Sequence, residues 1–177
     1  YTDIGILYVN DEYGKSLVDA LLIETESAGI TVTAQEAYLP MATDFRTVLA
    51  KINATESEPL IFIGIPPTTL ANMLRQAREL GMTLPIFEPG GLLMAGSVRN
   101  LLGTELIEGV YTTAYPSVLG LTGEQFIKEF RAKHNGEDPI WTVMLGYDSI
   151  HMIAGALKEK GDTFTEKLSA LRSFEGV

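Results

Sequence analysis

The sequence predicts an α/β fold, in which a doubly wound, mainly parallel five-stranded sheet is followed by an additional helical segment. Within residues 1–116, short apolar runs alternate with stretches whose apolar residues recur at helical spacing. Uninterrupted apolar runs are typical of parallel strands covered on both faces, and strands that alternate with helices pair in parallel. Within residues 117–177 only helical patterns remain. We therefore expect one domain at residues 1–116 and another at residues 117–177.

The chain opens with a predicted strand over residues 4–9, which are apolar almost throughout. A helix over residues 15–28 follows, because its leucines recur on one helical face, and Gly29 is suited to end it. Residues 30–38 alternate in polarity, which favours a strand at the edge of the sheet.

The next elements are predicted from helix caps and a buried strand. Thr43 or Asp44 precedes apolar residues spaced three and four apart, and a short polar side chain at this position caps a helix. Residues 60–63 form a short apolar strand. After a Pro-Pro break, Thr68 or Thr69 caps the following helix by the same reasoning.

Residues 84–87 and 110–115 are the last two predicted strands, with a short helix around Val98 between them. The second domain contains three predicted helices and no strand. These helices begin at Thr122, at Pro139, and at Thr163 or Thr165.

Composition excludes several function classes. The 177 residues include 13 Lys and Arg against 23 Asp and Glu, a net charge of −10, so we expect no nucleic-acid partner. The absence of Cys removes disulfides, thiolate nucleophiles and Cys-bound metals. His134 and His151 have no partner at metal-ligand spacing, so we expect neither a metal nor a cofactor. No apolar run approaches the roughly 20 residues that a membrane span needs.

Two patterns bear on catalysis, and neither supports an enzyme. The Gly-Lys-Ser at residues 14–16 follows a strand, as in a phosphate-binding loop, but Val9 stands where that motif requires its first glycine. Asp11 and Glu12 would also repel a polyanion. These two carboxylates and Glu88 could converge at one sheet edge for acid–base work, although plain surface acids are the commoner explanation. We therefore expect a protein that is not an enzyme.

Binding chemistry is better represented than catalytic chemistry. In doubly wound sheets, ligands bind at the carboxyl ends of the strands, where three predicted loops lie at residues 10–14, 64–69 and 88–92. An aromatic hydroxyl, glycines that admit close backbone approach and a proline wall are typical of a small-molecule cleft. The residues that supply these groups are Tyr13, Gly64, Pro66, Pro67, Gly90 and Gly91.

Six short segments follow one another in an informative order. They are YVNDEYG at 8–14, ATDF at 42–45, MLRQARELG at 73–81, PIF at 85–87, GYD at 146–148 and FEGV at 174–177. Each is weak alone, but the ordered set spans nearly the whole chain. The set resembles the type I periplasmic binding proteins, and within them the branched-chain amino-acid (Leu/Ile/Val) binding family of ABC importers.

The resemblance implies two similar α/β lobes joined by hinge strands, with the ligand trapped between them. This chain resembles the second lobe plus the helices that follow it, which in the family pack on the first lobe. We therefore expect a fragment of a longer protein. Either a missing portion of chain or association between copies would cover its apolar helices.

The resemblance also implies binding roles for single residues. Tyr13 matches a Tyr that lines the amino-acid site, and Tyr147 matches an aromatic position near the ligand side chain that comes from the other lobe's helices. Pro66 and Pro67 stand where some members have a ligand-contacting Tyr, so that contact is lost here. Gly90 stands where amino-acid binders have a Glu that pairs with the ligand ammonium. Either Glu88, two residues earlier, substitutes for that Glu, or the ligand carries no ammonium.

The expected function is capture without chemistry. The resemblance implies an extracytoplasmic solute-binding protein that closes around a small amino acid or related carboxylate and delivers it to the membrane permease of an ABC transporter. An aliphatic amino acid is favoured, and an aromatic acid is the second choice. The expected location is periplasmic or extracellular, with a lipid anchor in the full-length protein as one option. The alternative is a ligand-sensing domain of a receptor or regulator with the same fold.

Overall fold

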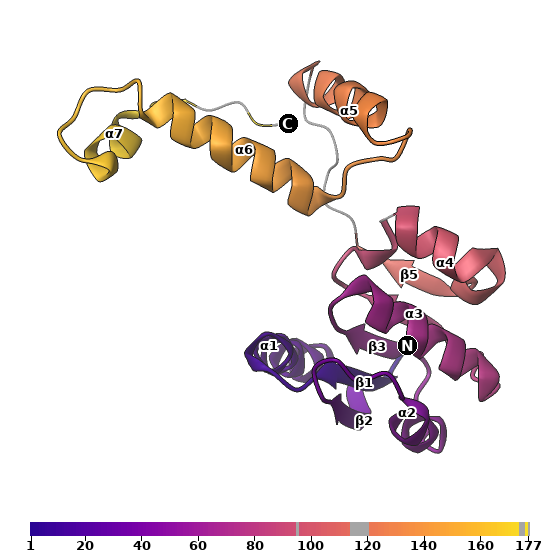
Figure 1. The fold of residues 1–177 in the computed structure, drawn as a ribbon. Coiled ribbons are helices and arrows are strands. Elements are labelled where there is room, and N and C mark those ends of the chain that lie inside the picture. The colour runs from indigo at the N-terminus through magenta and orange to yellow at the C-terminus, as the bar shows by residue number, and fades with distance from the viewer. Residues whose placement is uncertain (95, 114–120, 174–175, 177) are drawn as a thin grey trace. The chain divides into compact units, whose positions relative to one another are not determined.

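The computed structural model describes residues 1–94, 96–113, 121–173 and 176 (Figure 1). The chain divides into two units, Tyr1–Ala114 and Tyr115–Val177, and each is described by itself. The domain boundary that the sequence predicts, between residues 116 and 117, lies outside the described residues.

Five strands form one sheet in the described part of the first unit, in the order β2-β1-β3-β4-β5. The strands are β1 (Asp3–Val9), β2 (Thr31–Tyr38), β3 (Leu60–Ile63), β4 (Ile86–Glu88) and β5 (Val110–Thr112). Every neighbouring pair is parallel. The predicted parallel α/β fold is therefore confirmed, and β2 lies at an edge of the sheet, as its alternating polarity indicates.

Helices lie on both faces of this sheet. They are α1 (Glu12–Ala28), α2 (Arg46–Asn53), α3 (Pro67–Glu79), the 3-10 helix η1 (Leu92–Met94) and α4 (Gly96–Ile107). Successive residues of a strand point to opposite faces. Ile4 and Ile6 of β1 pack with Val18 of α1, whereas a side chain at Gly5 would meet Ile52 of α2. Because β1 is covered on both faces, its sequence is apolar almost without interruption.

The core of the first unit lies between the sheet and the helices. Its largest fully buried side chains are Ile6, Leu7, Phe45, Leu49, Ile52, Leu60, Phe62, Leu70, Met73, Leu74, Met82 and Ile86. Fully burying one side chain of this kind stabilises the fold by about 1.5–3 kcal/mol. The strands therefore form a rigid platform for the loops at their carboxyl ends.

The start of α2 differs from the prediction. Neither Thr43 nor Asp44 is the N-cap; Phe45 holds that position, without a side-chain cap. The Phe45 N–H donates instead to Oε1 of Gln76 at 2.6 Å, and Nε2 of Gln76 donates to the carbonyl of Thr43 at 2.8 Å. A buried glutamine from α3 thus anchors the segment before α2, while Oδ1 of Asp44 accepts a hydrogen bond from the Arg46 N–H at 3.0 Å.

The described part of the second unit is helical. Its helices are α5 (Leu121–Lys133), α6 (Trp141–Ala156) and α7 (Phe164–Ala170). Thr122 lies inside α5, so its predicted role as a cap is wrong. Thr163 caps α7, and Glu166 completes a capping box with it, which confirms the first of the two predicted starts.

Helix α6 carries many apolar side chains that remain exposed. Met144 and Ala156 are its buried residues, whereas Leu145, Ile150 and the C-cap residue Leu157 are each more than half exposed. Within the described residues, no helix has both the length and the apolar character that crossing a membrane requires.

Candidate functional site

The strand order places the topological switch point of the sheet at the carboxyl ends of β1 and β3. The chain passes from β1 to β2 on one side and then returns to β3 on the other side of β1. The connections that follow these two central strands therefore diverge, and ligands of doubly wound sheets bind where they do. Three loops meet at this edge: those that follow β1, β3 and β4.

The loop after β1 is shorter than predicted because α1 already begins at Glu12. Asp11 is the N-cap, and its Oδ1 accepts a hydrogen bond from the Gly14 N–H at 2.8 Å. A Cβ on Gly14 would overlap the carbonyl oxygen of Val9, so the helix packs directly against the strand end. Tyr13, on the first helical turn, is therefore held firmly at the edge, and it is 40% exposed.

The loop after β3 contains Gly64 and Pro66. A Cβ on Gly64 would overlap the hydroxyl of Tyr38 and lie 2.8 Å from Cζ of Phe62, so the position admits only glycine without rearrangement. The Ile65–Pro66 peptide bond is cis, and Ile65 and Pro66 are exposed.

Helix α3 also begins earlier than predicted. Pro66 is its N-cap and Pro67 its first residue, so neither Thr68 nor Thr69 acts as the cap. Proline suits the first helical position, because the missing N–H has no intrahelical acceptor there.

Tyr38 lies beneath this loop, and the sequence analysis does not single it out. Its ring stacks on Phe62 with centroids 5.9 Å apart and meets Phe45 edge-on at 5.1 Å. The hydroxyl donates to the carbonyl of Ile63 at 3.4 Å. Burial raises the pKa of Tyr38, and the charges of Asp11 and Tyr13 raise it further. A neutral phenol thus supports the edge between β1 and β3.

The loop after β4 is organised by Glu88, whose side chain is only 1% exposed. One carboxylate oxygen accepts from the Gly90 N–H, and the other accepts from the Leu92 N–H at 2.7 Å and from Oγ1 of Thr112 at 2.9 Å. Gly91 adopts the left-handed φ of 70° that the turn requires. This geometry does not favour the option in which Glu88 itself pairs with a ligand ammonium, because the carboxylate is already used within the unit.

The structure thus gathers Tyr13, Gly64, Pro66 and the loop of Gly90 and Gly91 at the carboxyl edge of one sheet. Tyr147 belongs to α6 in the second unit, where it is 37% exposed. The rings of Phe126 and His151 contact it there, with centroids at 4.6 and 4.2 Å.

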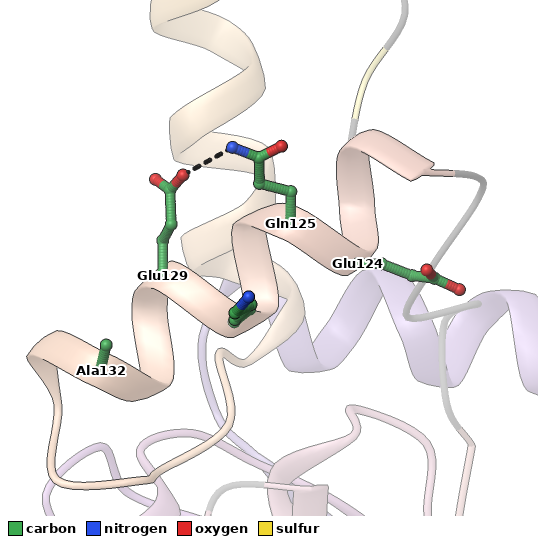
Figure 2. A pocket seen from close by; sticks show the side chains of 5 residues that line it. Glu124, Gln125, Glu129 and Ala132 are labelled. Carbon is green, nitrogen blue, oxygen red and sulfur yellow. Dashed lines mark hydrogen bonds between the residues drawn. The ribbon is translucent and has the colours of Figure 1, made fainter.

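Two hollows in the described residues are lined by other side chains. One, of about 640 Å³, is lined on α5 by the exposed, mostly polar residues Glu124, Gln125, Lys128, Glu129 and Ala132 (Figure 2). The other, of about 260 Å³, includes Arg78, whose guanidinium donates at 2.7 Å to the carbonyls of Met82 and Glu108. These two carbonyls precede β4 and β5, so this hollow lies at the opposite, amino edge of the sheet. Burial lowers the pKa of Arg78.

No cluster of His, Asp and Glu able to hold a metal ion occurs in the part of the chain that the structure describes. The candidate site is therefore built from aromatic, proline and glycine residues and from backbone groups. Such an arrangement can bind a small molecule by shape and by a few hydrogen bonds.

Comparison with known proteins gives three consistent findings. A family model described as periplasmic binding protein matches residues 1–177. An amino acid binding protein from Pseudomonas aeruginosa is 26% identical over 160 residues, which cover 89% of this chain and 42% of that protein.

Solved structures share the fold. LivJ, a branched-chain amino acid transporter substrate-binding protein from Streptococcus pneumoniae crystallised with isoleucine, matches with a TM-score of 0.79 and 23% identity, over 99% of this chain and 50% of its own. A solute-binding protein of an ABC transporter from R. palustris, in complex with benzoate, matches with a TM-score of 0.82 and 16% identity, over 96% of this chain and 47% of its own. The chain spans about half the length, or less, of each protein it matches here.

Proposed function

This chain belongs to the periplasmic binding protein family, and we propose that it supplies a ligand-binding lobe of an extracytoplasmic solute-binding protein that serves an ABC importer. The observation that carries the proposal is that Tyr13, Gly64, Pro66 and the Gly90–Gly91 loop lie along the same carboxyl edge of the sheet, at and beside the β1/β3 switch point. The family consists of solute-binding proteins, and we propose that this one captures its ligand without catalysis.

The proposed ligand is a small carboxylate with an apolar body. Tyr13, Ile65 and Pro66 offer exposed apolar surface at the edge, which suits an aliphatic or aromatic group. Because Glu88 is used within the unit, an aliphatic amino acid needs another acceptor for its ammonium, such as the Tyr13 hydroxyl or a loop carbonyl. An aromatic acid needs none. Isoleucine and benzoate, each bound by a structural neighbour, represent the two possibilities.

We assign the second unit to binding as well. Tyr147 is the proposed aromatic contact to the ligand side chain, and residues 117–177 are proposed to pack on a first lobe in a longer protein. The exposed apolar residues of α6 support this packing, because several exposed apolar side chains on one helix are typical of an interaction surface. Association between copies of this chain is the alternative. The proposed location is periplasmic or extracellular, with a membrane permease as partner and a lipid anchor as an option.

A thermal-shift screen with isoleucine and benzoate tests the proposal. A ligand at ten times its Kd stabilises the folded state by about 1.4 kcal/mol, which raises the Tm of a chain of this size by about 3–6 °C. We expect one of the two compounds to produce this shift. Tyr13→Ala should abolish it, whereas Tyr1→Ala, at the amino end of β1, should leave it unchanged. No shift with either compound, or an equal shift in Tyr13→Ala, would contradict the proposed site.

A further inference from the structure

Five aromatic rings of the second unit follow one another in contact, and we call them the aromatic ladder. In order, they belong to His134, Phe130, Phe126, Tyr147 and His151, with successive centroid distances of 3.9, 6.0, 4.6 and 4.2 Å. Both histidines of the chain are the ends of this ladder.

The ladder follows from helical spacing. Residues four apart lie on the same face of a helix, and the ladder uses one such face of α5 and one of α6. Phe126 and Phe130 are half-buried, whereas Tyr147 and His151 are exposed. Another face of α5 is polar and exposed, with a hydrogen bond of 2.9 Å from Gln125 to Glu129 (Figure 2). The aromatic face of α5 is therefore the one that meets α6.

Tyr147 is the ring of the ladder that bears a hydroxyl, and two neighbours constrain it. Phe126 approaches from α5 with an interplanar angle of 49°, and His151 stacks one turn further along α6 with an angle of 30°. A partly exposed tyrosine without ring contacts would sample several rotamers. Contacts from two sides restrict that sampling before a ligand arrives.

We infer that Phe126 and His151 are positioning residues that fix the ring of Tyr147 for ligand contact. The inference rests on the proposed function, in which Tyr147 touches the ligand side chain. Groups held in their binding orientation lose less conformational entropy on binding, so affinity rises without an added contact. Each aromatic pair corresponds to about a 2- to 12-fold change in an equilibrium constant.

Proton NMR tests the ladder without any ligand. The two histidines give two Cε1–H signals, which His134→Gln and His151→Gln assign, and nearby rings shift such signals. Phe126→Leu should move the His151 signal, although His151 contacts Tyr147 and not Phe126 in the ladder. Gln125→Ala, on the polar face of α5, should move neither signal. An unchanged His151 signal in folded Phe126→Leu would overturn the inference.

Calorimetric titration with isoleucine and with benzoate tests the effect on binding. His151→Ala, at an exposed position where the substitution should not impair folding, should lower the affinity for whichever probe binds about 2- to 12-fold. His151→Phe should restore most of that affinity, because it restores a ring. Phe126→Leu should weaken it similarly. If Tyr147→Leu weakens binding while His151→Ala and Phe126→Leu do not, the positioning role is wrong and the proposed function stands. If Tyr147→Leu has no effect on either probe, the proposed contact of Tyr147 is itself wrong.

Discussion

Glu88→Gln is expected to destabilise the first unit and to loosen the loop that follows β4. The glutamine keeps the shape of the side chain but replaces one acceptor oxygen with an NH₂ group that donates. Glu88 accepts from two backbone N–H groups and from Thr112, and its side chain is 1% exposed. Whichever way the amide is turned, the hydrogen bond to this side chain from one backbone N–H, of Gly90 or of Leu92, is lost.

The expected magnitude follows from that single loss. A hydrogen bond to a charged group contributes about 1.5–3 kcal/mol. For a chain of this size, a loss of about 1.5–3 kcal/mol lowers the Tm by roughly 3–12 °C.

Differential scanning calorimetry measures this effect against a matched control. Glu79 pairs with Arg46 at 2.8 Å on the surface, where both side chains are about half exposed. Glu79→Gln should therefore change the Tm very little, since solvent and salt screen exposed ion pairs. Equal Tm values for Glu88→Gln and wild type, or equal losses in the two variants, would refute the reasoning about the buried carboxylate.

Three further predictions concern the same edge of the sheet. Gly64→Ala should destabilise the fold by about 1–3 kcal/mol, because the added Cβ overlaps the Tyr38 hydroxyl, and adding Tyr38→Phe should recover part of this loss. Urea unfolding of the single and double variants measures both effects, and a Gly64→Ala variant as stable as the wild type would contradict the packing. Above pH 10 the wild type should lose stability by up to about 1.4 kcal/mol per pH unit, because Tyr38 ionises in the unfolded chain while its raised pKa keeps it neutral in the folded one. Tyr38→Phe should not show this loss of stability above pH 10. Parallel profiles of stability against pH for the two proteins would show that burial of the Tyr38 phenol does not cause the loss. Thr112→Val removes one of the donors to Glu88 and should speed amide exchange in the Gly90 loop relative to the wild type, and an unchanged exchange rate would contradict this role of Thr112.

The sheet is predictable from the sequence because its determinants are local. Residues 4–9 and 60–63 read as strands since both faces of the sheet are covered, and the alternation of residues 30–38 marks an edge strand. The α7 cap is likewise local, with Thr163 and Glu166 three residues apart. In these places, neighbouring residues alone decide the structure.

The helix starts that the prediction misses are decided by distant residues or by proline. Gln76 satisfies the backbone N–H of Phe45 from 31 positions away, so the sequence around Thr43 carries no sign of it. Pro66 is the N-cap of α3, and the hydroxyl residues that follow are not needed for that purpose.

The candidate site divides in the same way. The glycines and prolines of the loops stand out in the sequence, because turns and close packing require them locally. The role of Glu88 does not stand out, since its burial and its hydrogen bond from Thr112, 24 residues away, arise only in the folded sheet. The role of Tyr38 is not predictable from neighbouring residues, because its hydroxyl reaches the Ile63 carbonyl only when β2, β1 and β3 lie side by side.

The most direct test of the account is a map of amide NMR shifts on titration with isoleucine and with benzoate. If ligand binds at the switch point, the largest changes should fall on the amides of Tyr13, Gly64 and Gly91. Amides of Thr83 and Gly109, beside the hollow at the opposite edge, should barely change. Changes concentrated at that opposite edge, or none with either compound, would contradict the central claim that the carboxyl edge of the sheet is the binding site.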